Sequence, residues 1–267
     1  MKVVLFCGGL GLRLREYSDS IPKALVHIGD RPILWHLMKY YAHYGHKDFI
    51  LCLGHKARAI KEYFLQYEEC LTNDFTLVDG GKTVHLLNSD IQDWRITFVD
   101  TGLSANIGQR LLAVKNHLAS DEVFLANYAD GLTDLPLPVL IDFFHQHNKV
   151  ACFLGVKPLQ SFHVLSLDQD GGVKALKPAT GADVWINGGF FVLKHDIFSY
   201  IEQGEELVEK PFQRLISLNQ LAAYRYDGFW ACMDTFKEKQ WFDDMQARGQ
   251  VPWEVWRDPV QMGDDEC

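Results

Sequence analysis

The chain has little positive charge for its length. Its 267 residues hold 26 Lys and Arg against 35 Asp and Glu, which gives a formal net charge of −9 at pH 7. A surface that binds nucleic acid or an anionic membrane needs an excess of basic side chains over one face. The composition therefore argues against both as partners, and any anionic ligand has to be met by a local group of Lys and Arg.

Long apolar runs and paired cysteines are also missing. No stretch of about 18 uncharged apolar residues is present, as a membrane span would require, and the first residues lack the apolar segment of a signal peptide. The cysteines are scattered without a C-x-x-C pair, at Cys7, Cys52, Cys70, Cys152, Cys232 and Cys267. This favours reduced core thiols over a zinc site or a disulfide framework. We therefore expect a cytoplasmic protein with no membrane partner.

The sequence also lacks any feature that would divide it. There is no repeat, no low-complexity tract and no Pro/Ser-rich linker, and 48% of the residues are hydrophobic. This is enough apolar material for one large core. We therefore predict a single domain over residues 1–267.

Short apolar runs alternate with stretches of helical period. The runs suited to buried strands are Val3–Cys7, Phe49–Leu53, Ile96–Val99, Val123–Leu125 and Val150–Val156. The stretches of helical period are Ile33–Tyr44, Ala57–Tyr67, Gln109–Leu118, Val139–His147 and Met233–Arg248. This alternation predicts an α/β fold with a doubly wound, mainly parallel, Rossmann-like sheet. Turn signals at Asp170-Gly171-Gly172 and Asn187-Gly188-Gly189 predict a smaller antiparallel portion in the C-terminal half.

A glycine-rich stretch follows the first apolar run and reads FCGGLGLRLREYSDSIPKAL. Its glycines and its candidate phosphate-binding cations are Gly8, Gly9, Gly11, Arg13 and Lys23. Glycines at a strand end let backbone N–H groups approach phosphate oxygens, and nearby cations add charge. The Gly-Lys-Ser/Thr ending of a P-loop is missing, and Leu14 replaces the third glycine of a dinucleotide fingerprint. The stretch favours a triphosphate site, and the alternative is that both cations are solvated surface residues.

The chain resembles the sugar-phosphate nucleotidylyltransferases over nearly its whole length. The glycine-rich stretch is similar to the family signature G-G-x-G-T-R-x(n)-P-K. The similarity continues through Arg31–His36, Trp94–Gly102, Asp130-Gly131, Trp185–Phe191, Gly228–Trp230 and Met233–Thr235. The strings W-I-N-G-G-F-F and G-F-W-x-x-M-D-T are almost those of the glucose-1-phosphate cytidylyltransferase branch.

The resemblance implies roles for residues at a nucleotide. Lys23 would contact the α-phosphate and stabilise the transition state, and Arg13 would hold the triphosphate, so that both are catalytic candidates. The remaining nucleotide-binding candidates are Gly8, Gly9, Gly11 and Arg110. The alternative for Arg110 is an ordinary cation on a helix surface.

The resemblance also implies a magnesium site. Asp130 and Asp234 would be its two ligands, and Mg²⁺ typically takes one or two protein carboxylates and completes its shell with phosphate and water. Taken alone, either aspartate could be a helix cap or a turn residue.

The resemblance is less complete in the part of the chain that would bind the acceptor, the sugar phosphate. Lys177, Asn187 and Gly188 match sugar-phosphate-binding positions of the family, which places a nucleotide-binding half at about 1–135 and a sugar-phosphate and oligomerisation half at about 136–260. The chain departs from the family pattern at Leu12 in the glycine loop and at Ser161, His163 and Leu176 in the acceptor half. These departures leave the identity of the acceptor open.

The reaction implied is transfer of a nucleotidyl group, in the first place CMP from CTP, to a sugar 1-phosphate such as glucose 1-phosphate. The products are a nucleotide sugar and pyrophosphate. Two alternatives stay open: the same chemistry with UTP or another triphosphate and a different phosphorylated acceptor, and a nucleotide-binding protein without turnover. We expect a homo-oligomer, either trimer-based or a dimer or tetramer.

Overall fold

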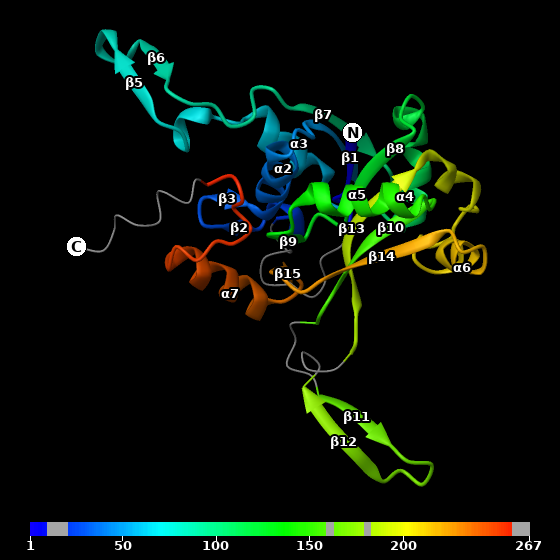
Figure 1. Ribbon diagram of the computed structural model, residues 1–267. Helices are drawn as coiled ribbons and strands as arrows, with labels where there is room; N and C mark the ends of the chain where they lie inside the picture. The colour runs from blue at the N-terminus through cyan, green and yellow to red at the C-terminus, as the bar shows by residue number, and fades with distance from the viewer. Residues whose placement is uncertain (10–20, 159–162, 179–182, 258–267) are drawn as a thin grey trace.

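The computed structural model describes residues 1–9, 21–158, 163–178 and 183–257. Its centre is a seven-stranded sheet (Figure 1). The strands lie in the order β14 (Leu221–Tyr226), β10 (Ala151–Val156), β13 (Ile186–Lys194), β8 (Val123–Asn127), β1 (Lys2–Phe6), β4 (Asp48–Leu53) and β7 (Arg95–Asp100). Within these seven strands only β13 runs antiparallel to its neighbours. The predicted mainly parallel sheet is confirmed.

Helices cover both faces of this sheet. One face packs against α2 (Ile33–His43), α3 (Ala57–Leu65), α5 (Leu137–His147) and α7 (Phe236–Ala247), and the other packs against α4 (Ile107–Ala113) and α6 (Lys210–Ser217). Strand β1 shows why two cores form. Val3 and Leu5 belong to the first core and Val4 and Phe6 to the second, because successive side chains of a strand point to opposite faces.

The antiparallel portion differs in one respect from the sequence-based prediction. Asp170-Gly171-Gly172 does lie in the connection between β11 (His163–Leu167) and β12 (Val173–Pro178). The turn predicted at Asn187-Gly188-Gly189 is wrong, because these residues lie inside β13. Gly189 has a φ of 77°, and a Cβ there would lie 2.6 Å from the ring of Tyr128. The glycine therefore permits close packing and an unusual backbone angle within a strand.

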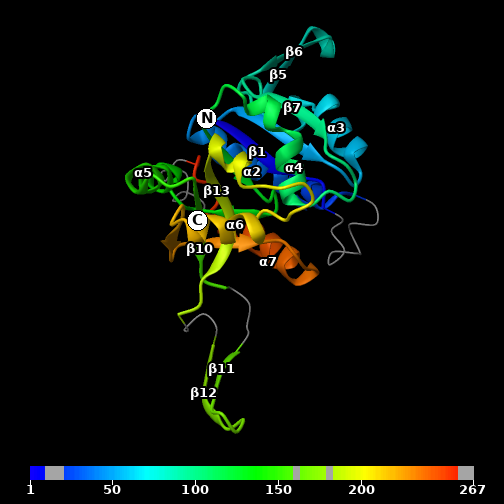
Figure 2. The same cartoon turned by 90° about the vertical axis from the view of Figure 1, so that its right-hand side faces the viewer.

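Two hairpins project from the body of the molecule (Figures 1 and 2). One consists of β11 and β12, and the other of β5 (Phe75–Val78) and β6 (Thr83–Leu86), a pair that the sequence pattern did not predict. Two shorter antiparallel pairs lie against the body: β2 (His27–Ile28) with β3 (Arg31–Pro32), and β9 (Gly131–Thr133) with β15 (Trp230–Cys232). No helix among the described residues is long and apolar enough to cross a membrane.

Candidate active site

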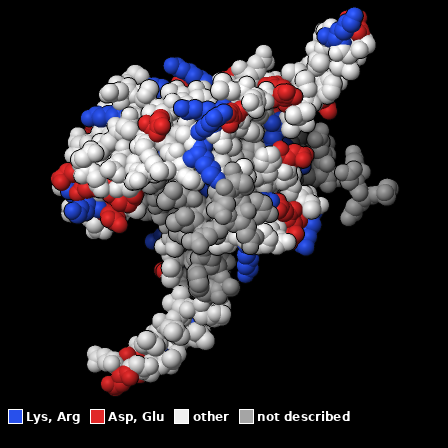
Figure 3. Space-filling view, turned by 180° about the vertical axis from the view of Figure 1, so that it is seen from behind, with Lys and Arg blue, Asp and Glu red and all other residues white. Residues whose placement is uncertain are grey.

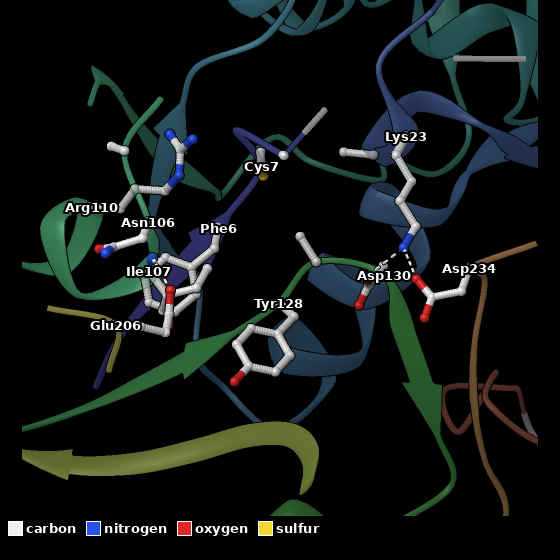
Figure 4. A pocket seen from close by; sticks show the side chains of 14 residues that line it. Phe6, Cys7, Lys23, Asn106, Ile107, Arg110, Tyr128, Asp130, Glu206 and Asp234 are labelled. Atoms are coloured by element: carbon white, nitrogen blue, oxygen red, sulfur yellow. Dashed lines mark hydrogen bonds and ion pairs between the residues drawn. The ribbon is translucent and has the colours of Figure 1, made fainter. Parts of the chain in front are cut away.

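Three charged side chains meet beyond the carboxyl end of β8. Lys23 begins a short 3-10 turn, Asp130 lies between β8 and β9, and Asp234 follows β15. The Lys23 Nζ lies 2.6 Å from Oδ2 of Asp130 and 2.5 Å from Oδ1 of Asp234 (Figure 4). In open α/β sheets, ligands bind at this edge. The cluster therefore lies where a functional site is expected.

The pairing of β9 with β15 brings the two aspartates together. Its register places Cys232 opposite Gly131, and the Met233 N–H donates to the Asp130 carbonyl at 2.9 Å. Asp130 directly precedes β9, and Asp234 lies two residues after the end of β15. Because the two strands are antiparallel, both aspartates lie at the same end of the pair. Two short strands thus bring together carboxylates that are far apart in the sequence.

Local backbone features direct each carboxylate toward Lys23. Ala129, directly before Asp130, has a φ of 64°, a conformation that costs energy for a residue with a Cβ. The N-cap of α7 is Thr235, which forms a capping box with Glu238. Because Thr235 caps the helix, the alternative that Asp234 serves as the cap is wrong, and its carboxylate is available to the cluster.

The electrostatics of the cluster are those of a partly buried ion triad. Burial disfavours the charge on Lys23, but the adjacent Asp130 and Asp234 outweigh burial and raise its pKa. Burial raises the pKa of Asp130; Lys23 opposes this change and Asp234 adds to it. Two carboxylates that both lie within 2.6 Å of one nitrogen favour a cation between them. One ammonium group supplies part of the positive charge that they can accept.

The same geometry fits a divalent cation. Both carboxylates reach a single point, which the Lys23 ammonium now occupies, and oxygen ligands of this kind suit Mg²⁺. Among the described residues there is no group of three or more His, Cys, Asp and Glu that could enclose a metal. The pair therefore suits an ion that keeps water or ligand oxygens in its shell, rather than a site enclosed by protein ligands.

A first cavity of about 440 Å³ extends from the cluster toward the loop after β1 and the start of α4. Gly9 borders it, and so do Asn106, Tyr128 and Glu206, together with the cluster itself. The cavity is large enough for a small-molecule ligand. The structure therefore places the predicted residues Gly9, Lys23, Asp130 and Asp234 on one cavity.

Arg110 also borders the first cavity, but it is neither on the surface nor free. Its side chain is 3% exposed, so the alternative of an ordinary surface cation is wrong. Its guanidinium donates to the carbonyls of Gly8, Leu53 and Gly102 and to the hydroxyl of Thr101, at 2.7 to 3.1 Å. These bonds connect the end of β4 with the loops that follow β1 and β7.

Gly8 makes room for this guanidinium. A Cβ on Gly8 would lie 2.0 Å from Nη1 of Arg110, whereas a Cβ on Gly9 would meet nothing within 4 Å. The two adjacent glycines therefore differ in what they do. Gly8 leaves the space that the Arg110 guanidinium occupies, whereas Gly9 borders the cavity with no side chain between its backbone and a ligand.

A second cavity of about 740 Å³ lies on the other side of the cluster. Asn187 and Gly188 of β13 border it, as do Trp230, Lys237 and Trp241. Tyr128, Asp130 and Asp234 border both cavities. The two cavities therefore meet at the charged cluster.

Tyr128 borders both cavities, and its hydroxyl forms a hydrogen bond with Asn187, which borders the second cavity. Asn187 donates from Nδ2 to the Tyr128 hydroxyl at 3.1 Å and accepts the Gly189 N–H on Oδ1 at 2.9 Å. Burial raises the pKa of Tyr128, so its hydroxyl is neutral at physiological pH. No sequence pattern singles out Tyr128 or Glu206, whereas Trp230 belongs to the matched string Gly228–Trp230.

The structure does not bring every predicted residue to the cavities. Lys177 lies on β12 in the projecting hairpin, paired with Val164, and borders neither cavity among the described residues. Leu176 is 60% exposed on the same strand, and His163 begins β11. Gly11, Leu12, Arg13 and Ser161 lie outside the described residues.

Comparison with known proteins identifies the relatives of this chain. The family model described as nucleotidyl transferase matches residues 2–258. A Bacillus subtilis protein named "Probable glucose-1-phosphate cytidylyltransferase" is 40% identical over 96% of this chain and 100% of its own length. A glucose-1-phosphate cytidylyltransferase of Salmonella typhi is 38% identical, again over 96% of this chain and 100% of its own length.

The fold is likewise that of a solved structure. A UDP-glucose pyrophosphorylase, solved with UDP-glucose, superposes with a TM-score of 0.67 at 15% identity and covers 93% of this chain and 98% of its own. The resemblance noted from the sequence motifs is confirmed by these matches. A family match over nearly all residues, with relatives at 38 to 40% identity that match over their full length, shows that the chain belongs to the nucleotidyl transferase family.

Proposed function

We propose that this protein transfers CMP from CTP to a sugar 1-phosphate, glucose 1-phosphate in the first place, and releases pyrophosphate. The product is then CDP-glucose or a related nucleotide sugar. The observation that carries the proposal is that two cavities meet at Lys23, Asp130 and Asp234. A reaction between two phosphorylated substrates needs two sites that meet where the phosphorus atom reacts. The names of the relatives support the choice of CTP and glucose 1-phosphate.

The bond changes follow from this arrangement. An oxygen of the sugar phosphate attacks the α-phosphorus of the triphosphate, and the bond from that phosphorus to the bridging oxygen breaks, so that pyrophosphate leaves. The attacking oxygen comes from the substrate, and no covalent nucleophile of the protein is required. The protein has to position two polyanions and compensate the charge that develops between them.

Lys23 is placed to provide part of that compensation. Its ammonium lies at the point where the cavities meet, so an α-phosphate positioned there would contact it. The raised pKa of Lys23 keeps the ammonium protonated through neutral pH. On the family resemblance, Arg13 and the glycines Gly8, Gly9 and Gly11 hold the remainder of the triphosphate. Arg110 supports the same loop through its bond to the Gly8 carbonyl.

We further propose that Asp130 and Asp234 hold Mg²⁺. When bound, such an ion supplies Lewis-acid polarisation and neutralises phosphate charge. Both side chains already converge on one cation, and burial of Asp130 strengthens its interaction with any positive charge. Asn187 and Gly188 border the second cavity, which is the proposed position of the sugar phosphate.

The surface supports the proposal of a homo-oligomer, trimer-based or a dimer or tetramer. On the face seen in Figure 3, few charged side chains lie along the two hairpins, and charges gather near their tips. Leu165, Leu167, Val173 and Leu176 are each more than half exposed on β11 and β12. Apolar surface of this kind on a projecting hairpin favours contact with another copy of the chain. In such an assembly a hairpin could bring Lys177 to the second cavity of a neighbour. We expect the assembly in the cytoplasm.

A substrate panel tests the proposed reaction. Pyrophosphate release is measured with CTP, UTP, dTTP and ATP, each against several sugar 1-phosphates, with and without Mg²⁺. We expect turnover to be highest with CTP and glucose 1-phosphate and to depend on the metal. Highest turnover with another pair would support the same chemistry on other substrates. Tight nucleotide binding without pyrophosphate release from any pair would contradict an enzymatic role.

A further inference from the structure

The two ends of the first cavity differ in charge and in available hydrogen-bonding groups. At one end lie Lys23, Asp130 and Asp234, and at the other lie Asn106, Arg110 and Glu206 (Figure 4). If the α-phosphate lies beside Lys23, as the proposed function requires, the base of the nucleotide extends toward the opposite end. The polar groups available there determine which base fits.

Two of the three polar side chains at this end are already engaged. Asn106 caps α4: its Oδ1 accepts the Gln109 N–H at 2.9 Å, and its Nδ2 donates to the Gly204 carbonyl at 2.9 Å. The terminal nitrogens of Arg110 donate to three backbone carbonyls and a threonine hydroxyl. Arg110 can only donate, and Asn106 keeps a single acceptor position on a neutral amide oxygen, so among the described residues at this end neither side chain offers a ligand a charged acceptor.

Glu206 has acceptor capacity to spare. One carboxylate oxygen accepts the Ile107 N–H at 3.1 Å, and the other accepts the Leu207 N–H at 3.0 Å. An ionised carboxylate has about four lone-pair positions, so about two remain. The side chain is partly exposed and borders the cavity, and the remaining positions can therefore be reached by a ligand.

The segment that carries Glu206 is fixed against α4. The Gly204 carbonyl accepts from Asn106, and a Cβ on Gly108 would lie 2.2 Å from the Glu205 carbonyl oxygen, so the two backbones are in close contact. The carboxylate of Glu206 is thus positioned before any ligand arrives, which lowers the cost of binding.

We propose that Glu206 selects the nucleotide base by accepting a hydrogen bond from an exocyclic amino group. Cytosine offers such a group at N4, and a glutamate that accepts from N4 is a familiar mode of cytosine recognition. Uracil and thymine carry a carbonyl oxygen at the same position. A second acceptor facing the carboxylate would be unpaired and repelled, so these bases are disfavoured. This inference rests on the proposed function and names the feature that sets its choice of triphosphate.

The test compares Glu206→Gln with the unchanged protein on three triphosphates. These are CTP, UTP and the triphosphate of 2-pyrimidinone riboside, which has neither an amino group nor a carbonyl at C4. We expect the unchanged protein to prefer CTP to both others by roughly ten- to a hundredfold in kcat/KM, the range for one hydrogen bond to a charged acceptor. In Glu206→Gln, kcat/KM for CTP should fall by a similar factor. The value for UTP should hold or rise, because the glutamine amide can donate to the carbonyl.

Glu205→Gln is the matched control. Glu205 is the adjacent carboxylate, bonds to Arg214 and does not border the cavity. This change should lower the melting temperature and leave the CTP to UTP ratio unaltered. An equal fall for all three triphosphates in Glu206→Gln would show a merely structural role and would overturn the proposal. Preference of the unchanged protein for UTP would overturn it as well.

Binding measurements separate this inference from the proposed reaction. Calorimetric titration with CTP and UTP needs no turnover, so it applies even if no pyrophosphate is released. A CTP preference that Glu206→Gln abolishes, in a protein without turnover, would sustain the role of Glu206 and refute the proposed reaction. Turnover with a preference for CTP that persists in Glu206→Gln would support the proposed reaction and refute the role of Glu206.

Discussion

The two sides of the charged cluster are built in different ways. On the side of the first cavity, Gly9, Lys23, Asp130 and Glu206 are held by the sheet and by the loops that follow its strands. On the side of the second cavity, Asn187 and Gly188 are equally well fixed in β13, but Lys177 lies out on the β11–β12 hairpin. The described residues of the first cavity thus all belong to the body of one chain, whereas Lys177, the proposed sugar-phosphate lysine, would reach the second cavity only if a hairpin lay beside it.

This difference teaches how each site can vary. The described residues of the first cavity pack within the body of the molecule, as the close contact of Gly8 with Arg110 shows, so changes there meet packing constraints. A projecting hairpin has few such constraints, and the departures from the family pattern that the structure describes, Leu176 and His163, both lie on it. If this hairpin serves the acceptor, as proposed, changes in acceptor specificity are tolerated there.

The largest expected effect is at the junction of the two cavities. Asp130→Asn and Asp234→Asn should each lower kcat by about a hundredfold or more, because each removes one carboxylate of the proposed site for the Mg²⁺ that neutralises the reacting phosphate, a loss of roughly 3 kcal/mol. Steady-state kinetics at saturating Mg²⁺ measure this loss. Asp121→Asn, at an aspartate paired with Lys2 away from the cavities, is the control. Near-normal turnover in either variant would remove that aspartate from the proposed metal site.

Lys23→Ala should also act mainly on kcat, by about fiftyfold to a hundredfold, because its charge is needed most in the transition state. Circular dichroism should show an intact fold, since the side chain lies at the cavity and not in either core. Lys47→Ala, at an exposed lysine that pairs with Asp93, should leave the kinetics unchanged. A change confined to the KM for the nucleotide would show that Lys23 does not act on the reacting phosphate.

A smaller effect is expected on the acceptor side. Lys177→Ala should lower kcat/KM for the sugar phosphate by about tenfold, the value of one charged hydrogen bond, with little change for the nucleotide. If the lysine acts on a neighbouring copy, mixed oligomers of Lys177→Ala and Asp130→Asn should regain activity, because some sites then combine two unaltered residues. Loss of activity in Lys177→Ala without recovery on mixing would place the lysine in the site of its own chain.

The smallest expected effect concerns stability rather than chemistry. Gly8→Ala should cost about 1 kcal/mol of unfolding free energy, because the new Cβ collides with the guanidinium of Arg110. Gly9→Ala, with open space around its Cβ, is the matched control and should cost much less. In an Arg110→Ala background the cost of Gly8→Ala should largely disappear. Denaturant unfolding of the four variants measures this coupling, and additive costs would contradict the contact.

The sequence predicted most of the fold. The run Val3–Cys7 and the stretch Ile33–Tyr44 became β1 and α2 to within a residue or two at either end, because buried strands and amphipathic helices are encoded by short-range periodicity. The hairpin β5–β6 was missed, and the turn predicted at Asn187-Gly188-Gly189 was wrong. A glycine in the sequence indicates an unusual backbone angle or a close contact, but it does not distinguish a turn from a tightly packed strand.

The sequence alone, through composition and motifs, thus determined the α/β class, the family resemblance and the candidates Lys23, Asp130 and Asp234. Only the tertiary structure decided how these candidates meet. The pairing of β9 with β15 brings the two aspartates close together, and Arg110 is buried against Gly8. The tertiary structure also brought Glu206 to the first cavity and left Lys177 on a projecting hairpin. The physical reason is that hydrophobic periodicity depends on neighbours along the chain, whereas a site depends on contacts between segments that only the packing of the sheet brings together.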